Sequence, residues 1–364
     1  MIGTALRVLR TEGARSAWHR ASERVAESVH RASLLARPAG ITVPILNVSM
    51  MGVAPRLGGV PTQLFFRLRE ERRLRDVALY APGFLELPAG GRRVGSVREA
   101  LAITGARVIH LEGTFGARLS DFADAELIVS VHETGAPREL LEAARVVVYP
   151  SRFLREHYGI EGEVIEPGVP LIRPSGTFSP PGGEKALARA LAPRERGEGG
   201  RRPGEGLRIA FAGAVQRHKG AHLLPELAER VQAEWHAFGG GDFPLPRNIR
   251  RHGYYRAGAL PALLRRYRIG RVVLPSIIEE SFSLVLSECW QAGVPVVAFD
   301  HGAVAERIRA HGGGLLAPLS AGAVGLAELL TQDAPPVPQN IPTSAGAAKA
   351  YLSLYRRCTM LAVQ

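Results

Sequence analysis

Two glutamates eight positions apart, Glu280 and Glu288, have the types and spacing that most directly suggest chemistry in this chain. A short loop follows Glu280, and from Leu284 onward apolar residues recur at helical spacing. The first backbone N–H groups of a helix have no partner within the helix and attract anions. The pattern therefore predicts an anionic ligand held beside two carboxylates. Two surface acids on an ordinary helix would show the same spacing, so the spacing alone leaves that alternative open.

The elements that must position these acids can be identified around them. Residues 271–274 are a short apolar, β-branched run, which is typical of a buried strand, and residues 294–299 form a second such run. Residues 284–292 between them predict a helix, with Gly293 as its C-terminal cap. Strand, loop, helix and strand together predict a βαβ unit of a parallel sheet.

Further candidate residues lie where other predicted strands end. His132 follows the strand predicted for residues 127–131, and the sequence GAVQRHKG at 213–220 follows the strand at 208–212. Gly59 belongs to a glycine pair after the strand at 43–48 and leaves room for close approach of a ligand to the backbone. Ligands of open α/β sheets bind at the carboxyl ends of strands, so these positions predict binding. His132 as a hydrogen-bonded structural residue is the alternative.

Taken together, these motifs resemble those of retaining glycosyltransferases of family 4, also called glycosyl transferases group 1. The resemblance rests on Glu280-x7-Glu288, the Gly213-x5-Lys219-Gly loop, the glycine turn at 239–241 and the strand-end His132, and it covers roughly residues 41–362. It implies an α/β, GT-B fold in which two doubly wound Rossmann-like domains face an interdomain cleft. It implies a hexosyltransferase that moves a sugar from a nucleotide-diphosphate sugar to an acceptor with retention of anomeric configuration.

The resemblance also implies roles for individual residues. Glu280 and His132 are the catalytic candidates, facing the donor sugar. The candidates for donor and nucleotide binding are Gly59, Arg217, Lys219, Gly240, Tyr254, Ser281, Phe282, Ser283, Leu284 and Glu288. The chain departs from the family pattern at Ala214, where arginine is common, and at Ser281 and Ser283, where glycine is usual. Arg217 is the candidate for supplying the missing charge. No metal ligand or cofactor is expected.

Domain boundaries follow from changes in composition. Residues 1–40 predict a basic helical extension, and residues 41–170 the N-terminal acceptor domain. Residues 171–206 are rich in glycine and proline and predict a flexible linker or insertion. Residues 207–345 predict the donor domain, and a helix at 346–362 is expected to cross back onto the first domain. The extension could lie on an anionic membrane through Trp18 and its arginines, or it could be a packing element.

Composition limits the remaining alternatives. The net charge of +12 suits anionic partners but also fits a bias toward arginine. No run of apolar residues is long enough to span a bilayer. The two cysteines show no disulfide pattern, which favours a cytoplasmic protein that could at most lie peripherally on the inner face of the membrane. Expected partners are a UDP-, GDP- or ADP-sugar and a glycan, lipid-linked or small-molecule acceptor, as in synthesis of cell-envelope polysaccharide; nucleic acid is not expected. A GT-B nucleotide-sugar epimerase and a catalytically silent GT-B scaffold remain alternatives.

Overall fold

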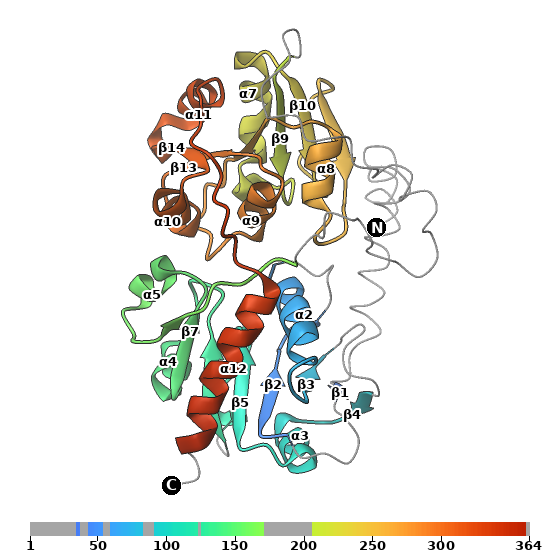
Figure 1. Ribbon diagram of the computed structural model, residues 1–364, viewed down its shortest axis with the longest axis vertical. Helices are drawn as coiled ribbons and strands as arrows, with labels where there is room; N and C mark the ends of the chain where they lie inside the picture. The colour runs from blue at the N-terminus through green and yellow to red at the C-terminus, as the bar shows by residue number, and fades with distance from the viewer. Residues whose placement is uncertain are drawn as a thin grey trace.

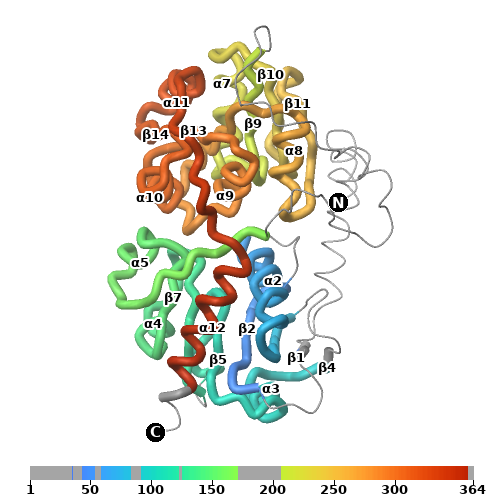
Figure 2. The backbone as a smooth tube through the Cα atoms, viewed as in Figure 1, coloured from blue at the N-terminus to red at the C-terminus, as the bar shows by residue number. Residues whose placement is uncertain are grey.

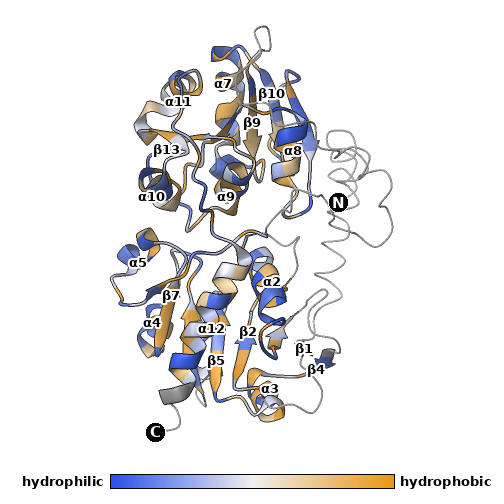
Figure 3. Ribbon diagram, in the orientation of Figure 1, coloured by the Kyte–Doolittle hydropathy of each residue, from blue (hydrophilic) through white to orange (hydrophobic). Residues whose placement is uncertain are grey.

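The computed structural model of the chain describes residues 34–36, 43–53, 59–82, 91–122, 125–170 and 206–361. Within these residues the strands form two sheets, one in each of two lobes (Figure 1). Apolar residues are concentrated in the inner strands of both sheets, so each sheet is the centre of a hydrophobic core (Figure 3). Of the predicted extension 1–40, residues 1–33 and 37–40 lie outside the described residues, as do residues 171–205 of the predicted linker 171–206.

The sheet of the first domain has the order β4-β1-β3-β2-β5-β6-β7-β8. From β3 to β8 all neighbours pair in parallel, whereas β1 pairs antiparallel with both β3 and β4. The strands are β1 (Leu34–Ala36), β2 (Ile45–Val48), β3 (Ala78–Ala81), β4 (Gly91–Arg93), β5 (Val108–Glu112), β6 (Glu126–Ser130), β7 (Val146–Tyr149) and β8 (Glu163–Val164). The helices are α2 (Gly59–Glu71), α3 (Val97–Thr104), α4 (Arg138–Ala143), α5 (Arg152–Tyr158) and the 3-10 turn η1 (Leu119–Phe122).

The sheet of the second domain has the order β11-β10-β9-β12-β13-β14 and is parallel throughout. The strands are β9 (Arg208–Ala212), β10 (Glu234–Phe238), β11 (Ile249–Gly253), β12 (Arg271–Leu274), β13 (Val296–Phe299) and β14 (Gly314–Ala317). The helices are α7 (Leu224–Arg230), α8 (Leu260–Arg266), α9 (Leu284–Gln291), α10 (Gly302–His311) and α11 (Gly322–Leu330), with 3-10 turns η2 (Arg217–Lys219), η3 (Ala221–Leu223) and η4 (Leu319–Ala321). Buried apolar residues lie on both faces of the sheet.

The last helix, α12 (Ser344–Leu361), follows the second domain in sequence but packs on the first (Figure 2). It contacts α2, and its buried Tyr351, Leu354, Tyr355 and Cys358 share a cluster with residues of the first sheet. The helix predicted for residues 346–362, and its return to the first domain, are therefore confirmed.

The strands predicted around the motifs agree with the structure to within two residues at either end. One part of the prediction is wrong: Leu34–Ala36 were assigned to a helical extension, but they form β1. The cause is that β1 has only three residues and is recognised by pairing with β3 and β4, which the local sequence does not reveal. The basic helix predicted for the rest of the extension stays a prediction.

Candidate active site

The loop after β12 carries the first acid, and α9 begins at Leu284 as predicted. Glu280 pairs with Lys219, whose Nζ lies 2.9 Å from Glu280 Oε1. Lys219 ends the 3-10 turn η2, and the following Gly220 has φ of +78°. A Cβ at Gly220 would lie 1.8 Å from the carbonyl oxygen of Pro275, so only glycine lets the lysine loop approach the end of β12. This close contact brings Lys219 and Glu280 together although 61 positions separate them.

Ser283 has a backbone conformation that is unusual for its type. Its φ of +69° and ψ of +90° place a residue with a Cβ in a region where glycine is favoured. The carbonyl groups of Phe282 and Ser283 both accept hydrogen bonds from Arg307 Nη1 at 3.1 Å. The sequence did not reveal this role of Arg307, because an arginine in a helix is normally expected at the surface.

Glu288 is buried, with 6% of its surface exposed, and its Oε1 accepts a hydrogen bond from the backbone N–H of Gly258 at 3.0 Å. Burial raises the pKa of this carboxyl from 4.5 to about 8, with the Gly258 hydrogen bond opposing the shift. The second acid of the motif thus differs in character from the first, because Glu280 is partly exposed and paired with a cation.

The glycine turn and the tyrosine form one packing unit. A Cβ at Gly240 would lie 2.1 Å from the ring of Tyr254, so the absence of a side chain there lets the ring pack on the turn. Arg217, at the start of η2, is exposed. These positions surround the carboxyl ends of β9 and β10, two strands that pair with each other.

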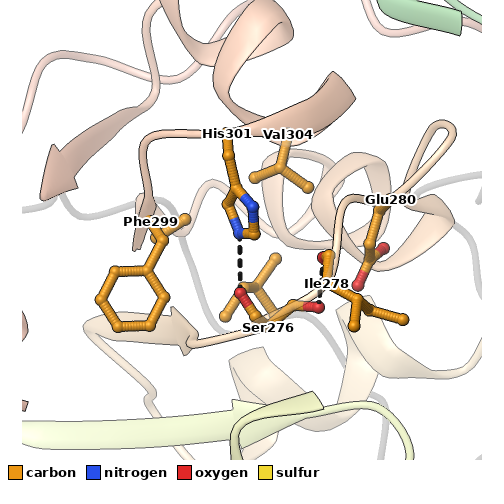
Figure 4. Close-up of a pocket in the computed structure, with 8 residues that line it drawn as sticks. Ser276, Ile278, Glu280, Phe299, His301 and Val304 are labelled. Carbon is orange, nitrogen blue, oxygen red and sulfur yellow. Dashed lines mark hydrogen bonds between the residues drawn. The ribbon is translucent and has the colours of Figure 1, made fainter. Parts of the chain in front are cut away.

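A small pocket lies beside Glu280, lined also by Ser276, Ile278, Phe299, His301 and Val304 (Figure 4). His301 Nε2 lies 2.8 Å from the carbonyl oxygen of Ser276, and the hydroxyl of Ser276 donates to the carbonyl of Ile278 at 2.9 Å. His301, which carried no predicted role, therefore fixes the strand end from which the Glu280 loop departs.

His132 lies in the first domain, after β6, in a second pocket that also includes Gln63, Arg67, Glu112 and Tyr351. Its Nδ1 is 2.8 Å from Gln63 Nε2, and its Nε2 is 3.7 Å from Glu112 Oε2. Gly59 begins α2, the helix that carries Gln63. A Cβ at Gly59 would meet no atom within 4 Å, so packing of the described residues does not require glycine there.

A buried polar network lies behind His132 and was not foreseen. Arg67 pairs with Glu112 and donates to Tyr355 Oη at 3.1 Å, while His110 Nδ1 lies 2.6 Å from the same oxygen. Burial alone would raise the pKa of Glu112, but the adjacent Arg67 and His110 hold it well below its usual value. Glu112 is therefore a carboxylate near neutral pH, fixed beside His132.

The two domains meet close to the Glu280 loop. The hydroxyl of Ser151, the N-cap of α5, donates to the carbonyl of Ser281 at 2.8 Å. Glu306 accepts hydrogen bonds from the backbone N–H groups of Arg152 at 3.2 Å and Phe153 at 2.5 Å. Because Ser151 follows β7 and Ser281 follows β12, the carboxyl ends of the two sheets are directed toward each other.

The structure thus brings Lys219 to Glu280, Tyr254 to Gly240, and Ser281 to Ser151 of the other domain. Arg217 lies in the turn after β9 and Gly59 begins α2, and among the described residues neither has a contact that assigns it a role. Among the described residues, no group of three or more His, Cys, Asp or Glu side chains could hold a metal ion. No helix in the described part of the chain is long and apolar enough to cross a membrane.

Comparison with known families finds that residues 206–332 match the family model described as Glycosyl transferases group 1. This segment runs from the start of β9 to the end of α11 and includes Lys219, Glu280 and Glu288. No curated protein matches the chain.

Solved structures resemble most of the chain. HepE from Anabaena, solved with UDP and glucose, is 19% identical with a TM-score of 0.56, covering 86% of this chain and 95% of HepE. Sucrose-phosphate synthase from Thermosynechococcus elongatus is 14% identical with a TM-score of 0.61, covering 88% of this chain and 100% of that one. AviGT4, a glycosyltransferase involved in avilamycin A biosynthesis, is 18% identical with a TM-score of 0.57. The match covers 87% of this chain and 98% of AviGT4. The likeness confirms the predicted GT-B fold.

Proposed function

We propose that this chain, whose residues 206–332 form a glycosyl transferases group 1 domain on a GT-B fold, is a retaining hexosyltransferase. In this proposal the donor is a UDP-, GDP- or ADP-sugar, and the acceptor is a glycan, a lipid-linked sugar or a small molecule. The observation that carries it is the contact of Lys219 with Glu280, at the loop that leads into the N-terminus of α9. A cation, a carboxylate and a helix N-terminus are the groups that a departing diphosphate and a reacting sugar require.

The proposed reaction breaks the bond between the anomeric carbon and the diphosphate oxygen. Negative charge then develops on the diphosphate, where Lys219 and the first backbone N–H groups of α9 stabilise it. The acceptor hydroxyl bonds to the anomeric carbon from the same face, and its proton goes to the departing diphosphate oxygen. A bound diphosphate competes with Glu280 for Lys219, so donor binding frees the Glu280 carboxylate to orient hydroxyl groups of the sugar.

The remaining roles follow from position. Glu288 accepts hydrogen bonds from the ribose, Tyr254 and Gly240 border the base, and His132 contacts the donor sugar from the first domain. Gln63 contacts the His132 ring at 2.8 Å, and the Glu112 carboxylate lies 3.7 Å from His132 Nε2. The positive charge in this scheme comes from protein groups, so transfer is expected to continue when divalent cations are chelated.

The test begins with thermal shift in the presence of UDP-, GDP- and ADP-sugars, because a ligand that binds the folded chain raises its apparent stability. The donor that stabilises the protein is then incubated with sugar and lipid-linked acceptors, and proton NMR identifies the anomeric configuration of the product. Glu280→Gln keeps the shape of the side chain and should bind the donor but lose turnover. Recovery of an isomerised donor without transfer would instead identify an epimerase. If the donor stabilises the protein but is not converted, the chain would be a silent scaffold.

A further inference from the structure

Arg307 lies behind the loop that precedes α9 and is almost wholly buried, with 1% of its surface exposed. It comes from α10, and its Nη1 donates to the carbonyls of Phe282 and Ser283. Its Nη2 donates to Ser287 Oγ at 2.8 Å, in the first turn of α9. The guanidinium carbon is also 3.8 Å from the centre of the Phe282 ring. One side chain therefore contacts the loop and the helix that follows it.

These contacts fix the direction of two backbone N–H groups. In a trans peptide the C=O and the next N–H point in opposite directions, and the described residues contain no cis peptide bond. Because the carbonyls of Phe282 and Ser283 point toward Arg307, the N–H groups of Ser283 and Leu284 point away from it. Neither N–H group donates to a backbone carbonyl among the described residues. Arg307 thus holds the strained Ser283 so that two donors are available on the opposite side of the loop.

No carboxylate among the described residues is in direct contact with Arg307, although Glu166 and Glu306 act on its charge from farther away. Among the described residues, no carboxylate lies within 4.0 Å of its guanidinium, and its Nε has no hydrogen-bond partner. The neighbouring Glu306 is directed toward α5 instead. Arg67, another buried arginine, contacts both Glu71 and Glu112. Burial lowers the pKa of Arg307 only to about 10, so it remains a cation at neutral pH. A buried cation without a counter-ion in direct contact is costly, and a bound anion would compensate it.

We propose that Arg307 is a positioning residue of the donor site, whose buried charge is balanced by the diphosphate of the bound nucleotide. It acts from behind the loop, turning the N–H groups of Ser283 and Leu284 toward the diphosphate and adding a positive potential to that of α9 and Lys219. The inference rests on the proposed function, since it assigns this anion to the donor. Arg307 does not touch the donor and takes no part in bond breaking.

The test separates charge from packing. Arg307→Met keeps most of the volume but removes the charge, and binding of UDP, UMP and uridine, or the same series for the base that the chain prefers, is measured by calorimetry. We expect UDP affinity to fall roughly tenfold or more and uridine affinity to change less than twofold, since the interaction scales with ligand charge. Unfolding in urea should show the variant to be no less stable than the natural chain. Arg309→Met is the matched control, because Arg309 is an exposed arginine of the same helix that pairs with Asp300.

Milder changes keep the test decisive if Arg307→Met does not fold. Ser287→Ala removes one hydrogen bond of the guanidinium and should weaken UDP binding a few-fold without affecting uridine. Arg307→Lys retains charge but cannot hold two carbonyls and Ser287 together, so it should recover only part of the affinity. Equal losses for UDP and uridine, or unchanged UDP affinity, would overturn the inference. Failure of the natural chain to bind any nucleoside diphosphate would instead overturn the proposed function.

Discussion

The pairing of Lys219 with Glu280 sets the first expectation at the scale of single residues. Lys219→Met removes the cation proposed to contact the diphosphate and leaves Glu280 without its partner. Loss of a charge-assisted hydrogen bond should weaken nucleoside diphosphate binding by about 1.5–3 kcal/mol. Calorimetry measures this directly. Lys349→Met provides the control, because Lys349 is an exposed lysine of α12. Unchanged affinity in Lys219→Met would remove the lysine from the site.

Glu288 gives a pH dependence with a definite sign. A carboxyl whose pKa is higher in the folded protein than in the unfolded chain favours folding most below its ordinary value of 4.5. That contribution is lost progressively as the pH rises toward about 8. Glu288→Gln should therefore flatten the decrease in unfolding free energy between pH 5 and 8, whereas Glu328→Gln, at an exposed position of α11, should not. The expectation would be contradicted if the unfolding free energy, measured in urea, fell equally with pH for Glu288→Gln and for the natural chain.

Residue types at fixed spacing could be recognised from the sequence, and contacts between distant residues could not. Glu280 and Lys219 belong to short local motifs, so their positions were predictable, although their direct pairing was not. Arg67 and Glu112 are 45 positions apart, and each is unremarkable in its own helix or strand. Arg307 was missed for a related reason, because its partners are backbone carbonyls, which no residue pattern reveals.

At the scale of the element, the N-terminus of α9 depends on the strained Ser283. Glycine reaches a positive φ without the clash of a Cβ, and relief of such strain is worth on the order of 1 kcal/mol. Ser283→Gly should raise the free energy of unfolding by about this amount, since the strain exceeds the added entropy of the unfolded chain. Ser281→Gly is the matched control and should lower stability, because Ser281 has no positive φ. Urea unfolding of the two variants distinguishes these outcomes, and a destabilised Ser283→Gly would show that the hydroxyl contributes more than the strain costs.

Elements were predictable where the sequence pattern is long or strongly apolar. The strands β5, β9 and β12 follow from short apolar runs, and α12 follows from apolar residues on one helical face. The edge strand β4 and its neighbour β1 have three residues each and no such signal. β1 is a strand through its pairing with β3 on one side and β4 on the other, and β4 pairs only with β1 among the described strands.

At the scale of the molecule, α12 joins the two domains by a route separate from the chain between residues 170 and 206. A protease site engineered within residues 171–205 would cut that connection and leave α12 attached to the second domain. The two pieces should nevertheless elute together in gel filtration, because Tyr351, Leu354 and Tyr355 are buried against the first domain.

A matched variant shows whether α12 is responsible for the association. Tyr351→Ala together with Tyr355→Ala removes two buried rings and their hydrogen bonds to Ser130, Arg67 and His110. The cut variant should separate into two species or precipitate. Coelution of its pieces would mean that other contacts, such as Glu306 with α5, hold the domains together.

The position of α12 also governs the order in which the chain can mature during synthesis. A ribosome extends the chain from residue 1, and domains commonly fold in the order in which they emerge. Here the sheet of the second domain is complete once residue 317 has emerged, whereas the first domain still lacks the tyrosines that meet Arg67, His110 and Ser130. The half translated first is therefore completed last, and until then its buried arginine and histidine have water in place of α12.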